Sequence, residues 1–191
     1  MNRRTSIKQI FVVGALGVST LSVFKWFQAN SVVKAESFDH YKNLLAELAE
    51  TIIPKTDTPG AKDAQVEVFI IKMMQFCEDR KTQHNFLNGL HSLETYTFSK
   101  YDHDFIRCNK SQRAQVLAYF EEKSYYSINI LNKINYKLLG SPFFTKLKEL
   151  TVQGYCTSQI GATNGLAYDY IPGTYEACIP LSKNQRSWAT K

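Results

Sequence analysis

The chain has 191 residues, of which 23 are basic and 17 acidic, and its formal net charge at pH 7 is +6. Five of the basic residues and none of the acidic ones precede Glu36, so 18 basic and 17 acidic residues follow, a net charge of +1. Because the excess positive charge belongs to the first 35 residues, it gives no support to a nucleic-acid-binding protein, and we expect no nucleic-acid partner. The remaining 156 residues are enough for one domain with a hydrophobic core.

The first 35 residues have the layout of a bacterial export signal. Arg3 and Arg4 stand ahead of an apolar run from Ile10 to Phe24, broken only by Gly, Ser and Thr. At 15 residues this run is shorter than the roughly 20 that a membrane-spanning helix needs. The paired arginines indicate the twin-arginine route, which exports proteins that have already folded. We therefore predict a twin-arginine export signal over residues 1–35.

The fate of this leader has two interpretations. Val33-Lys34-Ala35 supplies a small-residue cleavage site, which would make Glu36 the first residue of the mature protein. The alternative is an uncleaved N-terminal membrane anchor, in which Lys25 snorkels toward the interface.

Apolar residues recur at helical spacing through the first half of the mature chain. Steps of three and four from Phe38 to Ile52 predict a helix that Ser37 caps and Pro54 ends. A second helix follows from Val66 to Cys77, where a charged run marks a solvated end, and a third runs from Phe86 toward Tyr101. The predicted inward positions are Phe38, Tyr41, Leu45, Leu48, Ile52, Val66, Phe69, Ile70, Met73, Met74, Cys77, Phe86, Leu90, Leu93 and Phe98.

The second half continues the helical pattern. Ser111 is the predicted cap of a fourth helix, a weaker pattern over residues 128–138 predicts a fifth, and Ser141-Pro142 begins a sixth. The inward positions are Ala114, Val116, Leu117, Phe120, Ile128, Leu131, Ile134, Leu138, Phe143, Leu147, Leu150 and Tyr155. Because no sustained strand alternation occurs, we predict an all-α fold, a compact single-domain bundle of about five to six helices.

The C-terminal part of the chain has a different character. From Gly161 to Leu181 it is rich in Gly, Pro, Tyr and Asn and has no regular period. A loop of this length is uncommon in a compact domain unless it has a function or a partner, and this one is too apolar for a disordered segment. We predict a long irregular tail that packs on the helices, on another chain or on both. The domain accordingly covers residues 36–181, followed by a polar C-terminal end at 182–191.

The histidines offer only weak catalytic or metal-binding patterns. His84 and His91 share one helical face, Glu94 lies one turn further, and Glu47 or Glu50 could supply a ligand from another helix. A solvated polar face is the favoured interpretation, because the paired Glu-x-x-His motifs of di-iron bundles are missing. A metal-dependent enzyme remains the alternative.

A second weak pattern is Asp102-His103-Asp104, which suggests an oriented general base but is more typical of a surface loop. The sequence contains no nucleophile elbow and no phosphate-binding glycine loop. We therefore predict no catalytic, cofactor-binding or metal-binding residues in this chain.

Four cysteines follow the leader, at Cys77, Cys108, Cys156 and Cys178. An even number in an oxidising compartment allows disulfides, with the pairing left open, while buried free thiols are the alternative. No Cys-x-x-Cys motif is present, which argues against structural zinc.

Two stretches carry short motifs in a defined order. Residues 45–54 read Leu-Ala-Glu-Leu-Ala-Glu-Thr-Ile-Ile-Pro, and Thr-Asp-Thr-Pro-Gly-Ala follows at 56–61. Residues 147–181 contain Gly-Tyr, Thr-Ser-x-Ile-Gly, Pro-Gly-x-Tyr and Cys-x-Pro-Leu elements. Both stretches resemble the gluconate 2-dehydrogenase subunit 3 family, the small or gamma subunits of membrane-associated sugar and polyol dehydrogenases. Cys178 fits the family pattern, whereas Cys156 departs from it.

The resemblance implies a role that spacing alone does not show. In such complexes a large FAD-dependent subunit of the GMC type oxidises the sugar or polyol, and a cytochrome c subunit often accepts the electrons. The small subunit holds no cofactor and is not an enzyme. It supplies the export signal, engages the twin-arginine export machinery and assists maturation of the flavoprotein. The expected location is the periplasm, with attachment to the outer face of the cytoplasmic membrane through the complex.

The partner interface is expected on the aromatic-rich end of the chain, since tyrosine is enriched in interface cores. The tyrosine content and the matched motifs together give the candidates Tyr155, Thr157, Ser158, Ile160, Gly161, Tyr168, Tyr170, Pro172, Gly173 and Tyr175. Two alternatives stay open: an independent periplasmic metal-dependent enzyme and a membrane-anchored structural protein.

Overall fold

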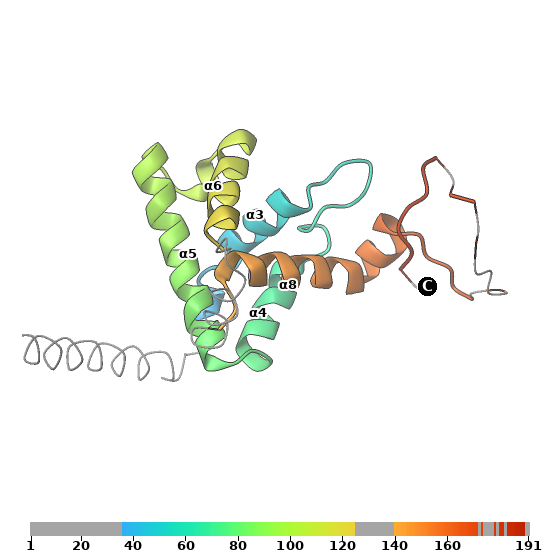
Figure 1. Cartoon of the computed structure of the whole chain (residues 1–191), viewed down its shortest axis with the longest axis horizontal. Helices are drawn as coiled ribbons and strands as arrows, with labels where there is room; N and C mark the ends of the chain where they lie inside the picture. The colour runs from blue at the N-terminus through green and yellow to red at the C-terminus, as the bar shows by residue number, and fades with distance from the viewer. Residues whose placement is uncertain are drawn as a thin grey trace, which may run out of the picture.

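The computed structural model describes residues 36–124, 140–171, 173, 178, 180–181 and 183–189. In this part of the chain the fold is all-α, as predicted (Figure 1). Its elements are α2 (Glu36–Asp39), α3 (Lys42–Ile52), α4 (Val66–Phe76), α5 (Arg80–Tyr101), the 3-10 helix η1 (Phe105–Arg107), α6 (Lys110–Lys123), α8 (Phe143–Thr157) and the π-helical turn η2 (Gly161–Gly165). Arg3, Arg4 and the helix predicted over residues 128–138 lie outside the described residues.

Helix α8 is the centre of the body. It crosses the middle of the molecule and packs against α3, α4, α5 and α6 (Figure 1). At its N-terminal end, the Phe143 ring meets Phe86 of α5 with 5.3 Å between ring centroids, and Phe86 meets Phe38 of α2 at 6.5 Å. A Cβ atom on Gly89 would lie 2.1 Å from the Phe143 ring, so this glycine permits the close approach of α5 and α8.

The buried core follows the predicted helical faces closely. Its fully or nearly fully buried side chains are Phe38, Leu44, Leu45, Leu48, Ala49, Ala61, Val66, Ile70, Ile71, Met74, Phe86, Leu90, Leu93, Phe105, Val116, Leu117, Phe143, Phe144, Leu147, Leu150 and Tyr155. Three predicted inward positions are wrong, because Cys77, Phe98 and Ala114 are exposed. Cys77 lies just past the end of α4, where the chain leaves the packed face.

The helix starts differ from the predictions in local detail. Ser37 lies inside α2, and the first predicted helix is interrupted at Tyr41, whose φ of −89° and ψ of 7° are not helical. Asn109, not Ser111, caps α6. Its side chain accepts the Gln112 N–H (2.9 Å), and the Gln112 side chain accepts the Asn109 N–H (2.9 Å), which makes a complete capping box.

Hydrogen bonds from polar side chains also fix the starts of α5 and α8. The charged run follows the end of α4, as predicted, and it also contains the start of α5, because Asp79 accepts the Thr82 N–H at 2.9 Å and caps that helix. Pro142 precedes the first residue of α8 and no side chain caps that helix. The carbonyl of Ser141 accepts a hydrogen bond from the Asn85 amide (2.7 Å), which fixes the start of α8 against α5.

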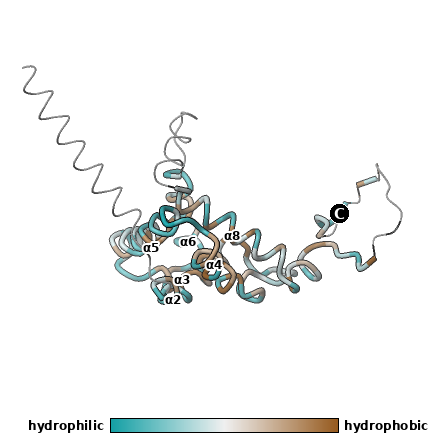
Figure 2. Tube along the Cα trace, turned by 90° about the horizontal axis from the view of Figure 1, so that it is seen from below, coloured by the Kyte–Doolittle hydropathy of each residue, from teal (hydrophilic) through white to brown (hydrophobic). Residues whose placement is uncertain are grey.

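Beyond η2 the chain leaves the helical body and later returns toward it (Figures 1 and 2). Among the described residues no strand occurs, and the sole pairing of extended backbone is a bridge between Ala167 and Trp188. None of the helices in this same part of the chain is long and apolar enough to cross a membrane.

Candidate partner interface

The C-terminal end of α8 is attached to the loop between α3 and α4 by one tyrosine. Tyr155 is 6% exposed, and its hydroxyl donates a 2.7 Å hydrogen bond to the carbonyl of Pro59. Burial raises the pKa of this phenol above its ordinary value. The two sequence stretches with family motifs therefore meet in space at this contact. Tyr155 was predicted at the partner interface; its side chain is packed inside this chain, and an interface role stays a prediction.

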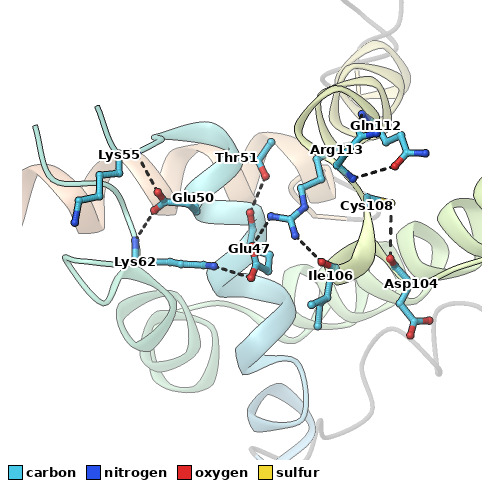
Figure 3. A network of polar contacts seen from close by, with 11 residues as sticks. Glu47, Glu50, Thr51, Lys55, Lys62, Asp104, Ile106, Cys108, Gln112 and Arg113 are labelled. Carbon is cyan, nitrogen blue, oxygen red and sulfur yellow. Dashed lines mark hydrogen bonds and ion pairs between the residues drawn. The ribbon is translucent and has the colours of Figure 1, made fainter. Parts of the chain in front are cut away.

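A carboxylate shapes the loop that Tyr155 contacts. Glu50 of α3 accepts the backbone N–H groups of Lys55 (2.9 Å) and Lys62 (3.0 Å), as Figure 3 shows. A Cβ atom on Gly60 would lie 2.5 Å from both carboxylate oxygens and 2.7 Å from the Lys55 nitrogen. Glycine is therefore required at this position for the loop to close around Glu50.

A second carboxylate joins the same loop to α6. Glu47 accepts a 2.6 Å bond from the Lys62 ammonium and pairs with the Arg113 guanidinium (Figure 3). Arg113 also donates to the Ile106 carbonyl (2.6 Å) and lies over the Phe105 ring. Burial raises the Glu47 pKa, but the Lys62 hydrogen bond and the Arg113 charge outweigh it and hold that pKa below its ordinary value. The sequence patterns did not reveal this network, because its members are far apart along the chain.

The proposed metal ligands are not assembled into a site. Glu47 and Glu50, the two candidates for a ligand from a second helix, are already bound by lysine, arginine and backbone groups. His91 and Glu94 line an open pocket of about 460 Å³ on α5. The described residues contain no group of three or more His, Cys, Asp or Glu side chains that could hold a metal ion.

The general base suggested by Asp102-His103-Asp104 belongs to a turn after α5. His103 Nδ1 lies 3.2 Å from the Asp104 carbonyl and 3.6 Å from Cys108 Sγ, so its ring contacts its own loop. Asp102 has a positive φ of 60° and is the C-terminal cap of α5. This geometry fits the surface-loop interpretation.

The four cysteines are free thiols in the structure. Cys108 is buried, and burial raises the pKa of its thiol. Cys77 and Cys178 are exposed and Cys156 is half-buried. A disulfide among these cysteines, which their even number allows, stays a prediction.

The turn after α8 is held by its own polar groups. Ser158 Oγ donates to the Tyr155 carbonyl (2.7 Å) and accepts the Gly161 N–H (2.9 Å). A Cβ atom on Gly165 would lie 2.3 Å from the Tyr155 hydroxyl oxygen, so η2 packs directly on that ring. Among the other predicted interface residues here, Thr157 bonds back to the Gln153 carbonyl (2.7 Å), and Ile160 is partly exposed.

The C-terminal residues come back to this turn. The Ala167 N–H donates to the Ser187 carbonyl (2.8 Å), and the Ala189 N–H donates to the Ala167 carbonyl (2.9 Å). Arg186 donates to the carbonyl of Asn164 at 2.8 Å. Sequence reasoning missed this contact, because a single bridge leaves no periodic pattern.

Between Ala167 and the returning segment lies the tail loop, defined here as residues 168–181. Its described large apolar side chains are exposed, namely Tyr170 (83%), Ile171 (75%), Leu181 (85%) and Tyr168. Gly173 has open space around it, with no atom within 4 Å of the position of an added Cβ. The predicted interface residues Pro172 and Tyr175 lie outside the described residues. The tail loop thus presents large apolar side chains to solvent at the end of α8 away from the core.

Comparison with known proteins gives one match. The family model described as gluconate 2-dehydrogenase subunit 3 matches residues 39–173. No curated protein and no solved structure gives a significant match. The matched range contains helices α3 to α8, the contact between Tyr155 and Pro59, and the first part of the tail loop.

Proposed function

Because the chain belongs to the gluconate 2-dehydrogenase subunit 3 family, we propose that it is the non-catalytic small subunit of a periplasmic FAD-dependent sugar or polyol dehydrogenase. The family match over residues 39–173 is the observation that carries this proposal. In the proposed complex, the flavin and the substrate bind to a large subunit of the GMC type, and a cytochrome c subunit accepts the electrons where one is present.

The distribution of side chains supports a binding role. The carboxylates that could have served chemistry, Glu47 and Glu50, stabilise the loop beside α8. Large apolar side chains are instead exposed on the tail loop, where a partner would bury them. An obligate pair would bury about 2,000 Å² or more in total, with a largely apolar contact.

The leader gives the small subunit a second role, which is to export the complex. Arg3 and Arg4 address the chain to a route that transports folded proteins. A flavoprotein that has folded around FAD in the cytoplasm and lacks its own signal would cross with this subunit bound to it. The small subunit would then also stabilise the flavoprotein until transport.

The test is the double change Arg3→Lys and Arg4→Lys, followed by cell fractionation and by assay of flavin-dependent dehydrogenase activity in each fraction. Both the small subunit and the flavoprotein should remain in the cytoplasm. The control is Lys8→Arg, which keeps the charge of the leader and leaves the arginine pair intact. Normal amounts of flavoprotein in the periplasm of the double variant would refute co-export by this chain.

A further inference from the structure

Three helices meet around a polar pocket that takes no part in the proposed function. The pocket has a volume of about 330 Å³ and lies where α5, the C-terminal end of α6 and the start of α8 come together (Figure 1). This volume is at the lower end of the range of small-molecule sites. We propose that the pocket binds a small hydroxycarboxylate, that is, an organic acid that also carries hydroxyl groups. The proposal concerns this chain alone and goes beyond the proposed function.

The charge at the pocket is positive. Among the described residues that line it, Lys123 of α6 is the one with a charged side chain. Its ammonium group lies 4.6 Å from the centroid of the Tyr119 ring, which supports the cation without neutralising it. Of the two glutamates that precede it, Glu121 is paired with Lys148 at 2.9 Å and Glu122 is exposed. The lining of the pocket therefore favours an anion.

The start of α8 adds to this preference. Pro142, Phe143 and Phe144 line the pocket, and no side chain in the described part of the chain caps this helix. The first N–H groups of a helix have no partner within it and carry a partial positive charge. An anion at this position would accept hydrogen bonds from them. The helix start and Lys123 belong to different helices, so two independent features of the pocket favour the same kind of ligand.

The neutral polar groups indicate that the ligand also donates hydrogen bonds. Asn85 donates an amide N–H to the Ser141 carbonyl (2.7 Å), which leaves its side-chain oxygen as an acceptor. Ser92 and Ser124 each donate to a backbone carbonyl of their own helix at 2.7 Å, so each hydroxyl oxygen keeps acceptor capacity. The amide of Asn88 lines the same pocket with both donors and an acceptor. This set of acceptors matches hydroxyl groups on the ligand.

Aromatic rings give the pocket an apolar wall. The Phe143 ring meets Phe120 edge to face, with 6.0 Å between ring centroids, and Phe86 at 5.3 Å. Gly89 also lines the pocket, at the place where its missing side chain lets α5 and the Phe143 ring come into contact. An apolar wall with a few polar groups is the usual composition of a small-molecule site, because the carbon chain packs while the polar groups orient it.

The experiment is calorimetric titration of the full chain with three open-chain probes. Gluconate has a carboxylate and hydroxyl groups, sorbitol has hydroxyl groups without the charge, and hexanoate has the charge without hydroxyl groups. Gluconate should bind with a Kd of about 1 mM or lower. Sorbitol and hexanoate should each bind about tenfold more weakly or worse, because each lacks one of the two classes of polar contact.

Variants then test the residues. Lys123→Gln removes the charge and should weaken gluconate binding about tenfold, and Asn88→Ala should weaken it about three- to tenfold. Lys123→Arg keeps the cation and should retain most of the affinity. The matched control is Lys110→Gln at the opposite end of α6, which should leave affinity unchanged. All three positions are exposed, so the melting temperatures of the variants should match that of the wild type.

Each alternative gives a different result. Absence of gluconate binding, or wild-type affinity in Lys123→Gln, would refute the site. Equal affinity for hexanoate would show a site for anions that does not recognise hydroxyl groups, and equal affinity for sorbitol would show that the charge plays no part. Inorganic phosphate that binds more tightly than gluconate would also overturn the assignment. The flavoprotein is absent from these titrations, so their failure leaves the proposed function standing, and cell fractionation tests that function separately.

Discussion

The helical body and the tail loop use the same kinds of side chain in opposite ways. In the body, Phe38, Phe86 and Phe143 pack against one another in tilted and edge-to-face contacts at the junction of three helices, and all three are buried. In the tail loop, Tyr170 and Ile171 have no such neighbours and face solvent. Helical spacing places the apolar residues of the body on shared faces that can pack together, whereas the tail loop lacks a periodic face. Apolar content alone therefore does not distinguish a core from a binding surface.

The largest expected difference between the two regions is in stability. Phe86→Ala should lower the free energy of unfolding by about 3–5 kcal/mol, because it removes a fully buried ring in contact with Phe38 and Phe143. Urea titration followed by circular dichroism measures this. Phe98→Ala on the same helix is the control, since that ring is exposed, and it should change stability by less than about 0.5 kcal/mol. Equal losses of unfolding free energy in the two variants would show that Phe86 does not belong to the core.

A smaller loss is expected at the network that shapes the loop beside α8. Arg113→Met leaves Lys62 as the remaining cation beside Glu47. This variant should lower the free energy of unfolding by about 2 kcal/mol. Arg107→Met, on the exposed surface of η1, is the control and should cost much less. Similar unfolding midpoints for the two variants would mean that the Arg113 contacts contribute nothing to stability.

The same network predicts a dependence on pH. The folded-state pKa of Glu47 is lowered from the ordinary value of 4.5, so its contribution is fully present above pH 4.5 and is lost as the pH falls through the lower folded value. The difference in unfolding free energy between the wild type and Glu47→Gln should therefore shrink as the pH is lowered below 4.5. Denaturant unfolding at a series of pH values tests this, and a difference that grows in acid would contradict it.

The smallest expected effect compares two tyrosines. Tyr155→Phe removes the donor to the Pro59 carbonyl and should cost about 1 kcal/mol, whereas Tyr170→Phe should leave stability of the free chain unchanged. Thermal unfolding of the two variants in parallel measures the difference. Loss of stability only in Tyr170→Phe would reverse the assignment of core and surface.

The helices were predictable because each carries its own pattern. Leu45, Leu48, Phe86, Leu90 and Leu147 lie at helical spacing, and all are buried as predicted. Helix starts were less predictable, since several polar residues near a boundary could act as the cap. Asn109 outcompetes Ser111 because Gln112 lies at the spacing that completes a capping box.

The candidate interface could be predicted only in part. Both tyrosines, Tyr155 and Tyr170, were interface candidates, and Tyr155 was also predicted as an inward position of the last helix; in the structure Tyr155 is buried beneath η2 and Tyr170 is exposed. The difference depends on Gly165, whose missing side chain lets the turn pack on the Tyr155 ring. Arg186 was not singled out from the sequence, since its partner Asn164 is in a different part of the chain.

The sequence by itself determined the all-α class and the motifs of the family, because each of these is a local pattern of residues, and it also predicts an export leader with an arginine pair. Tertiary structure decided which glutamates are already bound by cations and backbone groups, which carbonyl accepts the Tyr155 hydroxyl, and that the C-terminal segment returns to Ala167. These outcomes depend on contacts between residues that are distant along the chain. Such contacts form only when the helices have packed and brought the α3–α4 loop, the end of α8 and the C-terminal segment together.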